Sequence, residues 1–260
     1  MIWQLETSVA CALYGLLVGQ LVPTIIARVP EPVPDPESDA DQSALEADAL
    51  VPPTGPGQPE QLGQPGRPKE LYVDIARRRG LRAKTSLATA VVGGLVGGAV
   101  GWTPALSFLL YLAPIGVALA VIDWRTRLLP TKVIAPSYLV VIALVLLSAW
   151  AESDRSALFG AGWGWLVAGG SFFVLWFIYP RGMGYGDVRL SGVLGIVLGY
   201  LGWSELLVGI YAGFAVGGVG GLLLSMLRVV DRKAYPFGPF MLVGAVIGVM
   251  LGPGIAAWYS

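Results

Sequence analysis

The sequence predicts an all-α, polytopic membrane protein with about eight transmembrane helices. Of its 260 residues, 55% are hydrophobic and only 13% are charged, and the mean hydropathy is +0.69. Soluble domains carry about 25% charged residues. The apolar residues are concentrated in long stretches, and a helix of about 20 such residues crosses the roughly 30 Å of hydrocarbon in a bilayer.

Eight stretches are long and apolar enough to be spans. The first is expected to stay in the protein, because its N-terminal flank contains Glu6 and lacks the Lys or Arg of a cleaved signal peptide. Their glycine-rich faces favour close helix packing in lipid over phosphate binding. The predicted spans are residues 8–28, 84–102, 104–124, 133–150, 159–180, 187–203, 205–227 and 238–258.

The positive charges predict which side of the membrane each connection faces. With eight spans, the connections 29–83, 125–132, 181–186 and 228–237 lie on one side, and they and the adjoining span ends hold all the Lys and Arg residues except Arg155. Cytoplasmic loops are enriched in Lys and Arg. These four connections are therefore expected in the cytoplasm, and the N-terminus and C-terminus outside.

The longest connection divides the chain into three expected parts. These are a first transmembrane helix at 1–30, a largely disordered cytoplasmic loop at 31–83 and a seven-helix core at 84–260. Residues 31–66 carry eight acidic residues, no basic ones and many Pro, Gly and Gln residues, so they cannot bury enough apolar surface to fold. Residues 67–84 are basic and are expected to contact anionic lipid, and docking of a substrate by either half of the loop is the alternative.

Missing residue types restrict the chemistry that is possible. The sequence has no histidine and one cysteine, Cys11. A Ser-His-Asp or Cys-His nucleophile, a His-ligated zinc, a CxxC metal site and an intrachain disulfide are therefore excluded. We expect no metal and no cofactor, so that carboxylates, hydroxyls, lysines or backbone groups perform any reaction.

Two aspartates stand out from the other acidic residues. Asp123 ends the third predicted span and Asp187 opens the sixth, so both are expected at a similar depth on the cytoplasmic side. Ionisable residues at such depth are costly and indicate function. Two carboxyl groups at close range do not both ionise readily, so a pair supplies one general acid and one general base, which is enough to activate water against a peptide carbonyl. The structural alternatives are a helix N-cap for Asp187 and an ion pair of Asp123 with Arg125 or Arg127.

Three glycines precede the second aspartate. Gly182, Gly184 and Gly186 have no Cβ, so the backbone there can turn sharply and approach an extended substrate chain beside Asp187. The spacing also matches part of a dinucleotide-binding fingerprint. That fingerprint requires a preceding β-strand, whereas here a membrane helix is expected.

These residues resemble a known family. The segments 121–130 (VIDWRTRLLP) and 182–190 (GMGYGDVRL) resemble the two signature blocks of type IV prepilin peptidases, aspartic proteases of the bacterial inner membrane with a GxGD motif. The segments 236–240 (PFGPF) and 15–30 resemble two further family blocks. The resemblance covers about 105–260 together with 15–30.

The resemblance implies an endopeptidase in which Asp123 and Asp187 act on water at the cytoplasmic face. Its substrates would be prepilin or pseudopilin precursors of type IV pili or protein secretion systems, from which it removes a short basic leader. The implied partners are these precursors and membrane lipid, and no nucleic acid. Positions matching the family motifs are expected to shape the site or bind substrate: Gly182, Gly184, Gly186, Arg189, Pro130, Pro236, Gly238 and Pro239.

The sequence also departs from the family pattern. Members that methylate the new amino terminus carry paired CxxC motifs in the loop corresponding to 31–83, which has no cysteine here, so N-methylation has no support. Gln20 and Pro23 replace the usual Ser and Asn, and Arg189 replaces a Lys while keeping its charge.

Two other functional classes remain as alternatives. A proton- or cation-coupled transporter could use the two aspartates as a relay, but transport favours acids near the bilayer midplane. An inactive assembly scaffold for a pilus or secretion machine would not need both acids.

The predicted sidedness can be tested with reporter fusions. Fusions after Arg79, Lys132 and Lys233 should report a cytoplasmic location, and fusions after Arg155 and at the C-terminus should report the outside, because positive loops stay in the cytoplasm. A cytoplasmic C-terminus would mean that the number of spans is odd.

Overall fold

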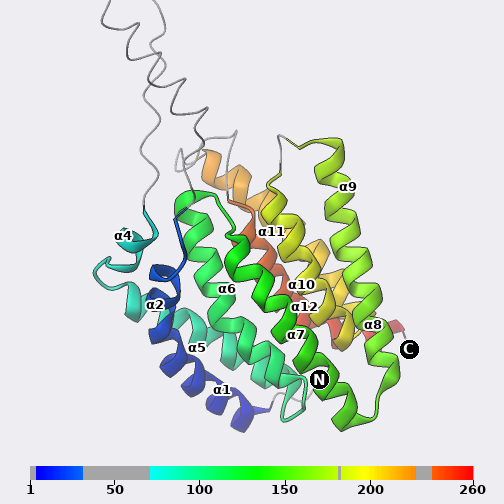
Figure 1. The fold of residues 1–260 in the computed structure, drawn as a ribbon. Helices are drawn as coiled ribbons and strands as arrows, with labels where there is room; N and C mark the ends of the chain where they lie inside the picture. The colour runs from blue at the N-terminus through cyan, green and yellow to red at the C-terminus, as the bar shows by residue number, and fades with distance from the viewer. Residues whose placement is uncertain (1–3, 32–70, 181–182, 227–235, 260) are drawn as a thin grey trace, which may run out of the picture.

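The structure is a computed structural model that describes residues 4–31, 71–180, 183–226 and 236–259 (Figure 1). All secondary structure in these ranges is helical, which confirms the predicted all-α class. The elements are α1 (Leu5–Val18), η1 (Gly19–Leu21), α2 (Val22–Ala27), α4 (Tyr72–Ala76), α5 (Leu81–Val100), α6 (Leu106–Thr126), α7 (Thr131–Glu152), α8 (Arg155–Gly164), η2 (Trp165–Gly169), α9 (Gly170–Ile178), α10 (Tyr185–Leu201), α11 (Trp203–Met226) and α12 (Gly238–Tyr259).

Seven helices in the described residues are long and apolar enough to cross a membrane. Two of them are composite: α1, η1 and α2 form one span, and α8, η2 and α9 form another. The remaining predicted span, 187–203, corresponds to α10, which has 17 residues and lies at the short end of the spanning range. The chain is therefore a multi-pass membrane protein. In Figure 1, α1 begins and α12 ends at one end of the bundle, whereas α6 ends and α10 begins at the other.

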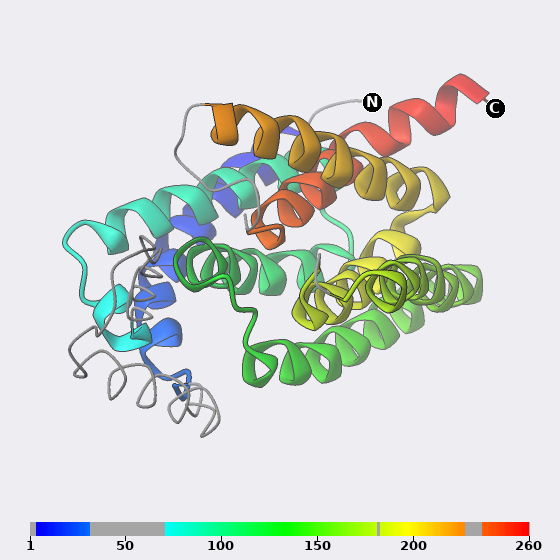
Figure 2. The ribbon, with the colours of Figure 1, turned by 90° about the horizontal axis from the view of Figure 1, so that it is seen from above.

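Helix α10 forms the centre of the bundle. Thirteen of its residues are buried, and it packs against α7, α8, η2, α9, α11 and α12. Figure 2 shows α6 and α10 between α7 on one side and α11 on the other. A helix that is apolar on all sides is stable only when protein or lipid covers all of it, and here protein covers most of α10.

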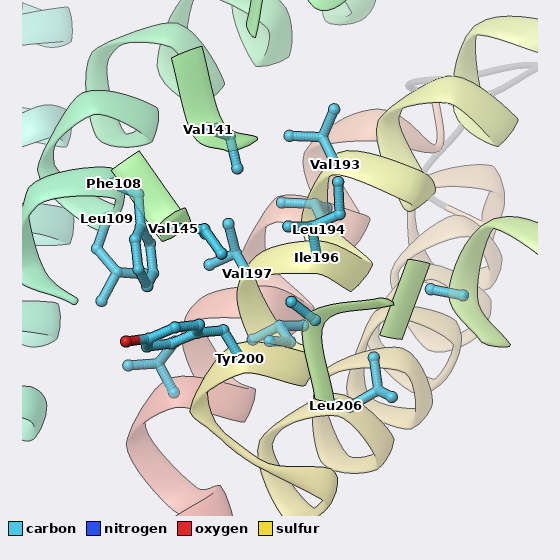
Figure 3. Packing of buried hydrophobic residues seen from close by; sticks show 14 of the residues in the cluster. Phe108, Leu109, Val141, Val145, Val193, Leu194, Ile196, Val197, Tyr200 and Leu206 are labelled. Atoms are coloured by element: carbon cyan, nitrogen blue, oxygen red, sulfur yellow. The ribbon is translucent and has the colours of Figure 1, made fainter. Parts of the chain in front are cut away.

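The main hydrophobic core surrounds this helix. Val193 and Val197 of α10 lie among side chains of α6 and α7, including Phe108 and Val141 (Figure 3). At the far end of α10, the ring of Tyr200 packs edge to face on Phe108 with 5.3 Å between the ring centroids. These contacts fix the position of α10 along its length.

Glycines let α8 approach α10 closely. A Cβ atom on Gly164 would lie 2.1 Å from the carbonyl oxygen of Gly195, and one on Gly160 would lie 2.4 Å from that of Gly199. Both distances are far below van der Waals contact, so the backbones meet directly. Glycine contacts of the same kind join α1 to α5 and α11 to α12, which agrees with the packing role predicted for the glycine-rich faces.

The loop predicted at 31–83 is only partly described. Its acidic stretch lies, apart from Glu31, outside the described residues. At its C-terminal end, residues 72–76 form α4, whose Tyr72 and Ile75 are buried against α2 and α6. Helix α5 begins at Leu81, three residues before the predicted start of the core.

The contact between α8 and α10 predicts a difference between two neighbouring glycines. Gly164→Ala should lower stability by about 1–3 kcal/mol, because the added Cβ overpacks against the α10 backbone. Gly162→Ala is the matched control, because a Cβ atom there meets nothing within 4 Å. Thermal unfolding in detergent, followed by tryptophan fluorescence, measures both variants; equal midpoints would contradict the packing described here.

Candidate active site

Asp123 is buried in the last turn of α6, with 4% of its surface exposed. Its Oδ2 accepts a hydrogen bond of 2.9 Å from the backbone N–H of Gly238, the first residue of α12. Helix α6 ends just beyond it, because Arg127 adopts a left-handed conformation with φ of 56° and donates its N–H to the carbonyl of Asp123 at 2.8 Å. The chain therefore turns away immediately after presenting this carboxyl group.

Asp187 is buried in the first turn of α10, with 8% of its surface exposed. Its Oδ2 accepts the N–H of Gly184 at 3.2 Å, while its own N–H donates to the carbonyl of Gly184 at 3.1 Å. The N-cap of α10 is thus Gly184, and the suggestion that Asp187 is the N-cap is wrong: Asp187 is the third helical residue and pairs with the cap reciprocally.

The second carboxylate oxygen of Asp187, Oδ1, is not hydrogen-bonded in the way that Oδ2 is. Oδ1 is buried and has no hydrogen-bond partner among the described residues. Buried carboxylate oxygens are normally satisfied, so such an oxygen requires an explanation. Within the described part of the chain, no protein group satisfies this oxygen.

The two aspartates belong to one site. They are close enough for the charge of Asp123 to act on Asp187. Leu129, in the turn after α6, lies against both supporting backbones: its Cβ would be 2.6 Å from a Cβ on Gly186, and its Cδ1 would be 3.4 Å from one on Gly238. The end of α6 and the starts of α10 and α12 therefore converge around this leucine.

The three prolines expected to shape the site lie at the starts of helices. Pro130 is the N-cap of α7, and its carbonyl accepts the N–H groups of Val133 and Ile134. Pro236 is buried just before α12, and Pro239 is the second residue of that helix, where the missing N–H of proline leaves no bond unmade. Both prolines next to α12 flank Gly238, so they help to fix the N–H that Asp123 accepts. Gly182 lies outside the described residues.

Arg189 lies at the edge of the site and is partly exposed. Its guanidinium stacks over the ring of Tyr185 at 4.6 Å and donates a hydrogen bond to the hydroxyl of Thr131. The hydroxyl of Tyr138 donates to the carbonyl of Arg189 at 2.8 Å. These bonds tie the first turns of α10 to α7, and they keep a positive charge two residues from Asp187.

Sequence reasoning assigned no role to Leu129, Thr131 or Tyr138. Leu129 falls inside the first motif block, but an apolar residue there looks like ordinary packing until the positions of Gly186 and Gly238 are known. Among the described residues, no group of three or more Cys, Asp or Glu side chains could hold a metal ion. What the site offers is two buried carboxyl groups, one with a free oxygen, and a nearby cation.

A comparison with protein families finds one match for this region. The model described as the type IV leader peptidase family matches residues 110–222, which include both aspartates. Residues 110–222 are therefore similar to the type IV leader peptidase family. This confirms the family resemblance seen in the motif blocks.

Several curated relatives carry the name prepilin leader peptidase/N-methyltransferase. The one from Pseudomonas aeruginosa is 30% identical over 175 residues, which is 66% of this chain and 59% of the relative. The one from Aeromonas hydrophila is 32% identical over 62% of this chain and 54% of the relative. The one from Escherichia coli is 32% identical over 55% of this chain and 61% of the relative. The chain thus spans little more than half the length of these relatives. No solved structure matches the chain.

Proposed function

We propose that this protein is a membrane aspartic endopeptidase that removes the basic leader peptide from prepilin-like precursors. The observation that carries the proposal is the buried pair of Asp123 and Asp187, each held through one oxygen by a backbone N–H, inside a leader peptidase domain. The names of the relatives supply the substrate class.

The pair provides the groups that peptide hydrolysis needs. One carboxylate accepts a proton from water as the water oxygen attacks the scissile carbonyl carbon, and the other carboxyl group donates its proton to the carbonyl oxygen. When the tetrahedral intermediate breaks down, the C–N bond is cleaved, the departing nitrogen takes up a proton from the protonated carboxyl group, and the carbonyl re-forms and returns its proton to the other carboxylate. The unpartnered Oδ1 of Asp187 is the oxygen available to hold the water.

The location of the site supports cleavage at the cytoplasmic face of the bacterial inner membrane. Both aspartates lie at helix ends, and the C-terminal end of α6 carries Arg125 and Arg127, in keeping with the positive-inside rule. A precursor whose basic leader remains in the cytoplasm would present its cleavage point at this level. Helix-end acids also favour a peptidase over a transporter, in which coupling acids lie near the bilayer midplane.

The proposal is limited to proteolysis. The relatives' names include N-methyltransferase, but residues 31–83 contain no cysteine and so lack the paired CxxC motifs expected of methylating members. The partners proposed are prepilin or pseudopilin precursors and the surrounding lipid.

Asparagine substitutions test the acid/base pair. Asp123→Asn and Asp187→Asn should each reduce leader removal to background while the protein still inserts, because an amide can neither accept nor donate the required proton. The double variant should be no worse than either single one, since residues acting as a unit are not additive. Leader loss from a co-expressed prepilin is read by mass spectrometry.

Asp154→Asn is the matched control for these variants. Asp154 is exposed and caps α8, and Asn is an equally good cap, so cleavage should stay at the wild-type level. If either Asp123→Asn or Asp187→Asn retains nearly the wild-type rate, that aspartate does not belong to the catalytic pair.

A second prediction concerns the N–H that holds Asp123. A Cβ on Gly238 would lie 2.8 Å from the Oδ2 of Asp123, so Gly238→Ala should displace the carboxylate and slow cleavage by about tenfold or more. Gly254→Ala, in the same helix and with nothing within 4 Å of its Cβ, should cleave normally. Equal rates in these two variants, measured at matched protein levels, would show that the Gly238 contact does not set the rate.

A further inference from the structure

The short helix α4 lies outside the spans, beside α2 and α6 (Figure 1). It has only five residues, yet Tyr72 is 3% exposed and Ile75 is fully buried. Such a short helix has almost no stability of its own. Its burial therefore comes from docking onto the neighbouring helices.

The docked side chains reach the turn of α6 that carries Asp123. Tyr72 and Ile75 belong to a buried cluster that includes Ile122, the residue directly before Asp123. The hydroxyl of Tyr72 also forms a hydrogen bond with the hydroxyl of Thr126, the last residue of α6. Helix α4 thus contacts the chain on both sides of the aspartate.

The environment of Tyr72 keeps its hydroxyl neutral. Burial and the charge of Glu31 raise the pKa of Tyr72 above its usual value and outweigh the lowering by Thr126, so the phenol, which is already neutral near pH 7, stays protonated to still higher pH. A neutral hydroxyl suits the hydrogen bond to Thr126, which in turn donates to the carbonyl of Ile122 at 2.9 Å. The contact continues through this bond into the backbone next to Asp123.

A hydrogen bond to Glu31 holds the start of α4. The Oε1 of Glu31 accepts the backbone N–H of Tyr72 at 2.7 Å. This bond joins the last described residue before the segment 32–70 to the second described residue after it. Glu31 therefore belongs with α2 and α4 rather than with the acidic stretch that follows it.

We propose that Tyr72 and Ile75 are positioning residues for Asp123, and that α4 braces the last turn of α6. The final turn of a helix lacks the hydrogen bonds that stiffen its interior, so it needs support from outside. Asp123 must meet the N–H of Gly238, on a segment 115 residues away, and small displacements of a reacting group are costly. The proposal rests on the peptidase function proposed above.

The test compares kcat and KM for a prepilin substrate in proteoliposomes. Tyr72→Ala and Ile75→Ala should lower kcat about tenfold with KM nearly unchanged, since α4 acts on the carboxyl group and does not touch the substrate. Tyr72→Phe keeps the packing and loses only the hydrogen bond, so its kcat should be about two- to threefold lower than that of the wild type. Asp74→Ala, on the exposed face of the same helix, should leave both constants unchanged.

Two further measurements separate positioning from general loss of stability. Leu206→Ala removes a fully buried side chain of α11, in a different core cluster, so it should lower the unfolding temperature without lowering kcat. A double-mutant cycle combines Tyr72→Phe with Thr126→Val. The double variant should lose no more kcat than the worse of the two single variants, because both substitutions break the same bond.

The proposal is overturned if Tyr72→Ala and Ile75→Ala cleave with wild-type kcat. It is also overturned if Leu206→Ala, at an equal loss of thermal stability, loses as much kcat as they do. Either result leaves the peptidase function intact. By contrast, a wild-type protein that does not cleave prepilin contradicts the proposed function itself.

Discussion

The direct backbone contact between α8 and α10 is the constraint on which the rest of the structure depends. Gly160 faces Gly199, and Gly164 faces Gly195, without side chains between them. Helix α10 can therefore lie in the middle of the bundle. There it contacts α7, α8, η2, α9, α11 and α12, and its first turn lies beside Leu129, in the turn that follows α6. Leu129 then fills the space between Gly186 and Gly238, so the depth of α10 decides where Asp187 stands relative to Asp123.

The two buried carboxyl groups are stabilised by N–H groups at the N-termini of helices. The first N–H groups of a helix have no partner within it, and the local dipole favours negative charge. Asp123 accepts the first N–H of α12, and Asp187 lies in the first turn of α10 and accepts the N–H of its cap. Each carboxyl group is therefore held by a backbone N–H at the start of a helix. One oxygen of Asp187 remains available for chemistry.

Much of this arrangement could be predicted from the sequence. The spans followed from long apolar stretches, and the two aspartates stood out because they fell at span ends and within recognisable motif blocks. The short α4 could not be predicted, because its two apolar anchors, Tyr72 and Ile75, stand in a polar loop and gain their stability only from α2 and α6. The bond from Gly238 to Asp123 joins residues 115 positions apart, and no local pattern indicates it. The alternative in which Asp187 is an N-cap put the start of α10 three residues too late, since a glycine can serve as the cap when a later side chain reaches back to it.

The most direct test of this account is whether the two aspartate-bearing segments meet at Leu129. Cysteines introduced at Leu129 and Gly186, in a Cys11→Ala background that removes the chain's one native cysteine, should form a disulfide readily under mild oxidation in membranes. A Cβ on Gly186 lies 2.6 Å from the Cβ of Leu129, so only a small outward shift is needed to reach disulfide geometry. The account predicts near-complete cross-linking, detected as a mass loss of about two hydrogens, and little for a control pair at Gly186 and Leu146. Cross-linking no greater than in the control would contradict the convergence of α6, α10 and α12 on which the site depends.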